Sequence, residues 1–258
     1  MKIVVLVKEV PDTYGDRKLS LETGLADRAA SETVLDEIGE RALEVALSYA
    51  DKNADAEIVV LSMAPAGSAA TVRKGLAMGA GSAVHVADEG LVGADLGLTA
   101  EVLAAAVRRT GFDLVIAGNV STDGSGGVMA SMVAELLDVP AATALNSVVI
   151  GDGTVSGERA SDAATMRVSA ALPAVISITE RLPDARFPNF KGIMAAKKKP
   201  FETLSLADLA IEPEDAGASR SIVLGLSEKP PRQAGTKIVD EGDAGQKLAE
   251  FLVQNRLV

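Results

Sequence analysis

The sequence predicts an α/β fold: a Rossmann-like, doubly wound, mainly parallel sheet with helices on both faces, a β-hairpin extension and an extended C-terminal arm. In the first half, short β-branched runs alternate with longer segments whose apolar residues recur every three or four positions. From about residue 145 the spacing becomes that of short strands separated by tight turns. With 258 residues, 48% of them apolar, the chain is long enough to bury a large core.

Four apolar runs in the first half have the length and composition of buried strands, and helical periodicity fills the intervals between them. The expected strands are Ile3 to Val7, Ile58 to Met63, Ser82 to Val86 and Leu114 to Ala117. The expected helices carry their apolar residues from Val34 to Tyr49, from Val72 to Leu76, from Leu98 to Ala105 and from Val128 to Leu136. Ser68 and Asp95 are placed to begin two of these helices, and Gly79 and Gly111 to end them.

The second half predicts hairpins that extend the sheet, followed by a less regular tail. The expected short strands are Ser147 to Ile150, Val155 to Glu158, Met166 to Ala170 and Val175 to Ile178. Beyond Leu182 the pattern weakens, Ile211 to Gly217 is expected to be a linker, and a last amphipathic helix carries Leu248, Phe251 and Leu252. We therefore divide the chain into residues 1–182, a nucleotide-binding α/β domain, and residues 183–258, a recognition loop with a C-terminal arm that docks on a partner.

Composition excludes several classes of function. The net charge of −11 disfavours nucleic acid as a partner, and the absence of Cys with a single His excludes thiolate zinc sites, disulfides and a Cys nucleophile. The apolar start of the chain is too short for a signal peptide, and no uncharged run reaches membrane-spanning length. We expect a soluble, cytoplasmic protein without membrane insertion, and no spacing in it indicates a catalytic triad.

A glycine-rich segment from Gly118 to Gly127 lies between the clearest strand and a well-formed helix. Ligands of open parallel sheets bind beyond the carboxyl ends of the strands, and a helix start attracts phosphate oxygens. The ends of the first two strands, near Leu6 and Met63, would form walls of the same crevice, while we interpret Lys8 as solvated. Neither dinucleotide nor Walker spacing occurs, so phosphate binding and an ordinary turn remain equally open at this point.

The segment Arg181 to Pro200, RLPDARFPNFKGIMAAKKKP, combines apolar residues with prolines that disfavour a helix or a regular strand. An aromatic residue rimmed by charge on an irregular loop is typical of an interaction surface, although a lysine run is more often simply solvated.

The motifs IVVLVKEVPDT, LAMGA, DLVIAGNVSTDGSGG and above all RFPNFKGIMAAKKKP resemble those of the beta subunit of electron transfer flavoprotein, particularly its actinobacterial form. The resemblance runs from end to end. It implies a carrier subunit without catalytic residues, paired with an alpha subunit that holds most of one FAD. It also implies AMP as a structural nucleotide, acyl-CoA and related dehydrogenases as electron donors, and a quinone oxidoreductase as acceptor.

The resemblance also assigns roles to individual residues. Thr13 and Leu35 would lie nearest the flavin, and Phe190, supported by Ile193 and Met194, would dock on the dehydrogenase. The residues that would contact AMP are Leu6, Met63, Gly118, Asn119, Val120, Ser121, Thr122, Asp123, Gly124, Ser125, Gly126, Gly127, Val128 and Met129. Two alternatives stay open: a bifurcating form in which a second FAD replaces AMP, motivated by the roomy glycine-rich loop, and a nucleotide-binding or nucleotide-hydrolysing domain that works alone.

Overall fold

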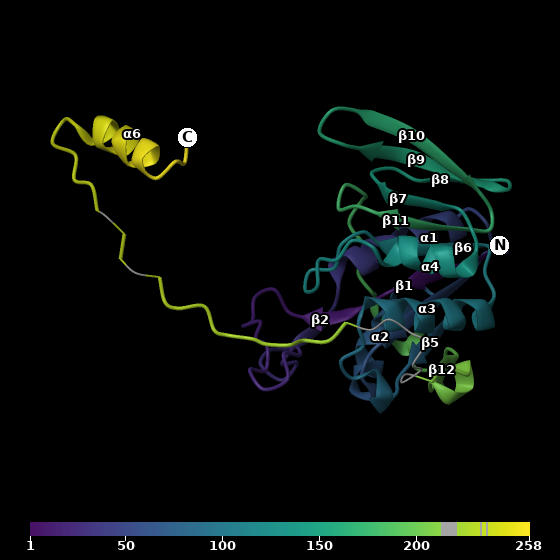
Figure 1. Cartoon of the computed structure of the whole chain (residues 1–258). Helices are drawn as coiled ribbons and strands as arrows, with labels where there is room; N and C mark the ends of the chain where they lie inside the picture. Colours follow the sequence, from purple (N-terminus) through teal and green to yellow (C-terminus); the bar gives the residue numbers. More distant parts are fainter. Residues whose placement is uncertain (213–220, 233, 236) are drawn as a thin grey trace. The chain divides into compact units, whose positions relative to one another are not determined.

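The computed structural model describes residues 1–212, 221–232, 234–235 and 237–258 (Figure 1). Contacts divide the chain into one compact unit, Met1–Leu224, and a second, Gly225–Val258. Of the linker predicted from Ile211 to Gly217, residues 213–217 lie outside the described residues.

A seven-stranded parallel sheet forms the centre of the first unit, in the order β12-β5-β4-β1-β6-β11-β7. Its strands are β1 (Lys2–Leu6), β4 (Glu57–Met63), β5 (Ser82–Val86), β6 (Leu114–Gly118), β7 (Ala141–Leu145), β11 (Ala174–Ile178) and β12 (Phe201–Leu204). The central strands are apolar on both faces, because each strand in a doubly wound sheet is covered by helices on both sides. The chain passes from β1 to β4 on one side and later to β6 on the other, so the order reverses between β1 and β6.

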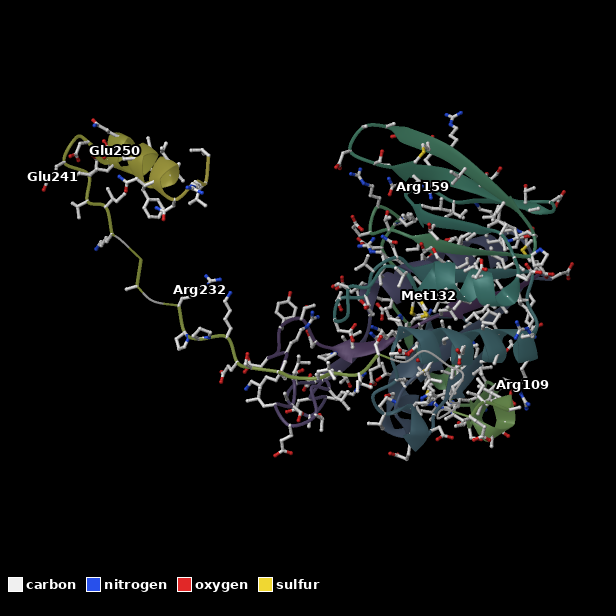
Figure 2. All side chains as sticks on the ribbon, in the orientation of Figure 1. Arg109, Met132, Arg159, Arg232, Glu241 and Glu250 are labelled. Carbon is white, nitrogen blue, oxygen red and sulfur yellow. The ribbon has the colours of Figure 1, made fainter. Side chains whose placement is uncertain are left out.

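Two layers of helices cover this sheet, which confirms the doubly wound fold. α1 (Glu37–Ala50) and α2 (Ala69–Met78) pack on one face. Leu43 of α1 and Leu76 of α2 belong to the same core there as the inward residues of β1. α3 (Leu96–Thr110) and α4 (Met129–Leu137) cover the other face; Met132 of α4, labelled in Figure 2, packs at the edge of this second core. Short 3-10 turns lie at Ala66–Ser68, Glu89–Leu91 and Ala207–Leu209.

The helix ends largely follow the sequence prediction. Asp95 caps α3 by accepting a hydrogen bond from the backbone of Leu98, and Gly79 and Gly111 end α2 and α3 with positive φ angles. Ser68 precedes α2 as expected but makes no cap hydrogen bond with its side chain. Its hydroxyl instead donates to the buried carboxylate of Glu9 at 2.6 Å.

The hairpin region differs in detail from the prediction. β8 (Val149–Gly151), β9 (Thr154–Ala160) and β10 (Thr165–Ala171) form a separate three-stranded antiparallel sheet, so they do not add strands to the central one. Gly153 turns the first hairpin with φ +74°, a backbone conformation that favours glycine. The predicted strand from Val175 to Ile178 is β11, a parallel strand inside the central sheet, because its residues are buried on both faces.

Several elements were not predicted from the sequence. β2 (Glu9–Pro11) pairs with β3 (Thr33–Leu35), where the sequence pattern placed loop and the start of a helix. The expectation that Arg181 to Pro200 excludes a helix is wrong: α5 (Phe190–Ala196) forms there, with Asn189 accepting a hydrogen bond from the backbone of Gly192 at 2.8 Å. After α5 the chain forms β12, which pairs with β5 at the sheet edge.

The second unit contains the predicted C-terminal helix, α6 (Ala244–Gln254). Leu248, Phe251 and Val253 on it are exposed within this chain. Among the described residues, no helix combines the length and the apolar character needed to cross a membrane.

Candidate functional site

Three of the residues predicted to line a crevice meet at one edge of the central sheet. β1 pairs with β4 and with β6, all parallel, so their carboxyl ends lie side by side. Leu6, Met63 and Gly118 are the last residues of these three strands. Because the strand order reverses between β1 and β6, this edge is the place where open α/β sheets bind ligands.

The loop between β6 and α4, which we call the glycine loop (residues 118–128), lies at this edge. The structure starts α4 at Met129, preceded by Val128, whose side chain makes no cap hydrogen bond. The first backbone N–H groups of α4 therefore have no side-chain acceptor at the cap, and they carry the positive end of the helix dipole. Such a terminus binds phosphate or carboxylate oxygens.

Glycines serve two different purposes in this loop. A Cβ on Gly118 would lie 2.6 Å from the side chain of Ile38, and Gly127 has φ +68°, so packing and backbone conformation require glycine at both. A Cβ on Gly124 or Gly126 would meet no atom closer than 3.6 Å. Glycine at those two positions is not required by the fold, since a Cβ there would make only ordinary van der Waals contacts.

Lys8 does not stand free in solvent, contrary to our interpretation of the sequence. Its Nζ lies 2.7 Å from Oδ1 of Asp123 in the glycine loop. Burial opposes ionisation of Asp123, but the hydrogen bond and charge of Lys8 outweigh it and lower the pKa of that carboxyl. A cation therefore lies beside the loop and is already oriented toward it.

Asp36 contacts the glycine loop although no sequence signal marks it, because an acidic residue at a helix start is usually solvated. It is 1% exposed, and its Oδ2 accepts a hydrogen bond from the backbone N–H of Thr122 at 3.0 Å. Asp36 Oδ1 and Thr122 Oγ1 are buried without a hydrogen-bond partner among the described residues. Burial is the main cause that raises the pKa of Asp36.

The two residues expected nearest a flavin lie in the segment that leads to Asp36. Thr13 is exposed, whereas Leu35 is 2% exposed and packs in the core under α1 and α2. Arg17 of the same segment donates to the backbone carbonyl of Thr122. No sequence signal identified Arg17, since nothing local in the sequence shows which distant carbonyl a loop arginine reaches.

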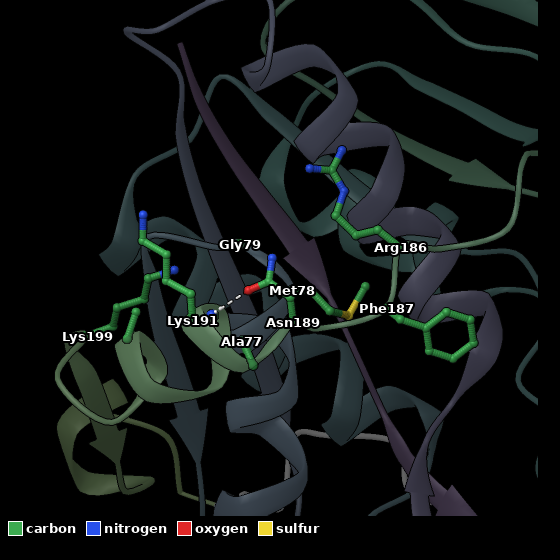
Figure 3. Close-up of a pocket in the computed structure, with 10 residues that line it drawn as sticks. Ala77, Met78, Gly79, Arg186, Phe187, Asn189, Lys191 and Lys199 are labelled. Atoms are coloured by element: carbon green, nitrogen blue, oxygen red, sulfur yellow. Dashed lines mark hydrogen bonds between the residues drawn. The ribbon is translucent and has the colours of Figure 1, made fainter.

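The expected docking residues lie together on α5. Phe190 is 79% exposed, Ile193 and Met194 are each half exposed, and the neighbouring Phe187 projects its ring away from the ribbon (Figure 3). A cavity of about 320 Å³ between α5 and the end of α2 is lined by Met78, Phe187 and Lys191, among others. A short helix is unstable in water when isolated, so α5 must be stabilised by tertiary contacts.

Those contacts come from both flanks of α5. Arg186 donates from Nε and NH2 to the two carboxylate oxygens of Glu44 at 2.8 Å each, and it also pairs with Asp51. These carboxylates raise the pKa of the Arg186 guanidinium. On the other flank, Lys199 donates to the carbonyls of Leu76 and Ala80, and burial lowers the pKa of its amine.

The single histidine, His85, is a buried residue that contacts the backbone. It is 1% exposed, and its Nε2 lies 3.0 Å from the backbone oxygen of Ala64. In the part of the chain that the structure describes, no group of three or more His, Asp or Glu side chains is arranged to hold a metal ion.

Comparison with known proteins identifies the family. The model of the electron transfer flavoprotein domain matches residues 23–209. The chain is 43% identical to the electron transfer flavoprotein subunit beta of Mycobacterium tuberculosis, with 99% of both chains covered. This chain belongs to the electron transfer flavoprotein family. As a member of its beta-subunit group it is an electron-transfer carrier rather than an enzyme.

Two more distant relatives also align with nearly the whole of this chain. It is 29% identical to the subunit beta of Bacillus subtilis, over 98% of this chain and 96% of the relative. It is also 30% identical to the caffeyl-CoA reductase-Etf complex subunit CarD of Acetobacterium woodii, over 98% of this chain and 97% of that subunit. The resemblance read from the sequence motifs is therefore confirmed at the level of the family.

Proposed function

We propose that this protein is the small subunit of an electron transfer flavoprotein heterodimer, and that it binds AMP as a structural nucleotide in the glycine loop. The supporting observation is the α4 start, which offers unpaired backbone donors at the reversal point of the sheet. Lys8, which is paired with Asp123, places a cation beside the loop, and glycine at positions 124 and 126 keeps two points of the loop free of side chains. The adenine would lie between Leu6 and Met63, and the phosphate near Val128 and Met129.

The flavin in this proposal is one FAD held mainly by an alpha subunit, which supplies the redox chemistry of the complex. Thr13 is exposed and would contact it directly, whereas Leu35, being buried, would support the flavin-facing wall from inside. Residues 183–258, including the exposed apolar side chains of α6, would pack on that alpha subunit and on the electron donor.

Electrons would arrive from acyl-CoA and related dehydrogenases and leave to a quinone oxidoreductase. The apolar surface of α5 supports the first part of this route, because an exposed aromatic beside basic residues fits an apolar pocket with an acidic rim. Phe190 would enter the pocket, with Ile193 and Met194 packing around it. The role of this subunit is then to bring two cofactors close together.

Denaturing the purified complex and identifying the released nucleotides by mass spectrometry tests this proposal. One AMP and one FAD per heterodimer is the expected result, and the absence of any adenylate would overturn the nucleotide role. Two FAD and no AMP would favour the alternative, a bifurcating complex with a second flavin in the glycine loop. ATP turnover by the chain alone would favour a self-sufficient nucleotide hydrolase.

The docking role has a separate test in Phe190→Ala. Removing an interface anchor costs about 2 kcal/mol, which is roughly a 30-fold fall in kcat/KM for dehydrogenase-linked flavin reduction. Flavin content should stay unchanged. Val149→Ala, which trims an exposed apolar side chain in the three-stranded sheet, is the matched control. Equal kinetics for the two variants with every dehydrogenase tested would remove the docking role from Phe190.

A further inference from the structure

The peptide groups on either side of Thr122 form hydrogen bonds with side chains from two separate parts of the N-terminal region. The Thr122 N–H donates to Asp36 Oδ2 at 3.0 Å, and its carbonyl accepts from Arg17 NH1. One residue later, Asp123 is paired with Lys8 at 2.7 Å. Two consecutive residues of the glycine loop are thus held by side chains that come from before, within and after the segment 12–35.

This segment has little regular structure of its own. Its last residues form β3, which pairs with β2 just before the segment, and an isolated bridge joins Leu19 to Ala26. Most of its side chains are exposed. Regions with few buried contacts open locally at low free energy. Arg17 extends from the middle of this segment to the glycine loop, and its NH2 also reaches the carbonyl of Pro11 at 3.3 Å.

The loop side of this connection carries two buried polar atoms. Asp36 Oδ1 and Thr122 Oγ1 are both buried and without a hydrogen-bond partner among the described residues. Burial raises the pKa of Asp36 and the hydrogen bond from the backbone of Thr122 opposes that effect, so the position of this loop residue decides how well the buried carboxylate is compensated. Asp36 is therefore sensitive to any shift of Thr122, which a ligand bound at the loop could cause.

We propose that Asp36 and Arg17 are positioning residues that couple nucleotide binding in the glycine loop to the ordering of segment 12–35, the segment that carries Thr13. This inference rests on the proposed nucleotide role of the loop. A nucleotide that fixes the Thr122 backbone strengthens the hold of both side chains, and by linkage an ordered segment strengthens nucleotide binding. AMP bound in the glycine loop would thereby order segment 12–35, which carries the residue expected to face the flavin.

Limited trypsin digestion of the full chain, with and without AMP, measures this coupling directly. The segment contains cleavage sites at Arg17, Lys18 and Arg28, and Lys237 in the second unit provides an internal reference. We expect saturating AMP to slow cleavage at Lys18 and Arg28 at least about fivefold, the lower end of usual coupling factors, relative to Lys237. Calorimetry on the same sample reports whether AMP binds.

Variants separate coupling from simple stability. Arg17→Gln and Asp36→Ala should reduce the AMP protection to less than about twofold, whereas Asp36→Asn, which keeps an acceptor for the Thr122 N–H, should retain most of it. Arg167→Gln, on the exposed β10 strand, is the matched control and should behave like the parent chain. If Asp36→Ala fails to fold, Arg17→Gln still decides.

The outcomes are distinct. AMP binding with protection that Arg17→Gln abolishes supports the coupling. AMP binding without protection, or with protection that survives in Arg17→Gln, overturns the coupling and leaves the nucleotide role intact. No AMP binding by the parent chain overturns both.

Discussion

Replacing Arg186 by alanine should destabilise the chain by about 2 kcal/mol. Two hydrogen bonds of 2.8 Å join its guanidinium to Glu44, whose side chain is only 14% exposed. A hydrogen bond to a charged group is worth ~1.5–3 kcal/mol, and the partial exposure of Arg186 places this pair in the lower part of that range. The pairing with Asp51, whose side chain is 60% exposed, adds ~0–1 kcal/mol.

Urea denaturation monitored by circular dichroism gives the free energy of unfolding, and an unchanged m-value would show that the unfolded state is unaffected. Arg167→Ala is the matched control, because Arg167 also pairs with a glutamate, Glu158, but its side chain is 89% exposed. We expect less than about 0.5 kcal/mol for this control. A double-mutant cycle with Glu44→Ala isolates the pair from other effects of truncation.

The reasoning fails if Arg186→Ala costs no more than Arg167→Ala, or if the cycle gives no coupling energy between Arg186 and Glu44. Either result would mean that the crossover before α5 is held by its apolar contacts alone. The same variant should also weaken dehydrogenase-linked reduction, since α5 would no longer be held in one orientation.

Further predictions concern packing, buried polar groups and pH. Gly192→Ala should destabilise the chain by ~1–3 kcal/mol in urea denaturation, because the new Cβ would lie 2.3 Å from the backbone oxygen of Ala77; an unchanged midpoint would contradict this packing. Ser68→Ala should cost ~1–3 kcal/mol by removing the donor from the buried carboxylate of Glu9, and a neutral effect would show that water replaces it. Burial raises the pKa of Asp36, so the native chain binds this proton more tightly than the unfolded chain and loses stability as pH rises from about 4 through the folded-state pKa. The free energy of unfolding of Asp36→Asn should therefore rise relative to that of the parent chain between about pH 4 and pH 7. Parallel curves of unfolding free energy against pH for the two chains would refute this.

Prediction from the sequence succeeds where apolar periodicity alone decides the structure. The runs that form β1, β4 and β6 are apolar on both faces, which only a doubly covered parallel sheet explains. The reversal of strand order between β1 and β6, which marks the candidate site, follows from this pattern without knowledge of any side chain. Gly153, Asp95 and Gly111 likewise act locally, as turn or cap residues, and local signals can be read from the sequence.

Prediction fails where partners distant in the sequence decide. α5 forms despite a flanking proline because Asn189 caps it and because Arg186 is held by Glu44 on another helix. Asp36 has the composition of a solvated helix start, yet it is buried because the glycine loop lies over it. Lys8 is drawn to Asp123 across 115 residues, a pairing with no local sequence signal.

The position of α5 in the connection between β11 and β12 determines how the choice of protein partner can be altered. α5 is not an appendage: it belongs to the connection that joins an inner strand to the edge strand β12. Lengthening or deleting this connection would detach the border of the sheet, whereas exchanging the outward side chains of α5 leaves every strand in register. Under the proposed docking role of α5, other electron-donor proteins are therefore best accommodated by point substitutions on α5, with the length of the helix kept constant.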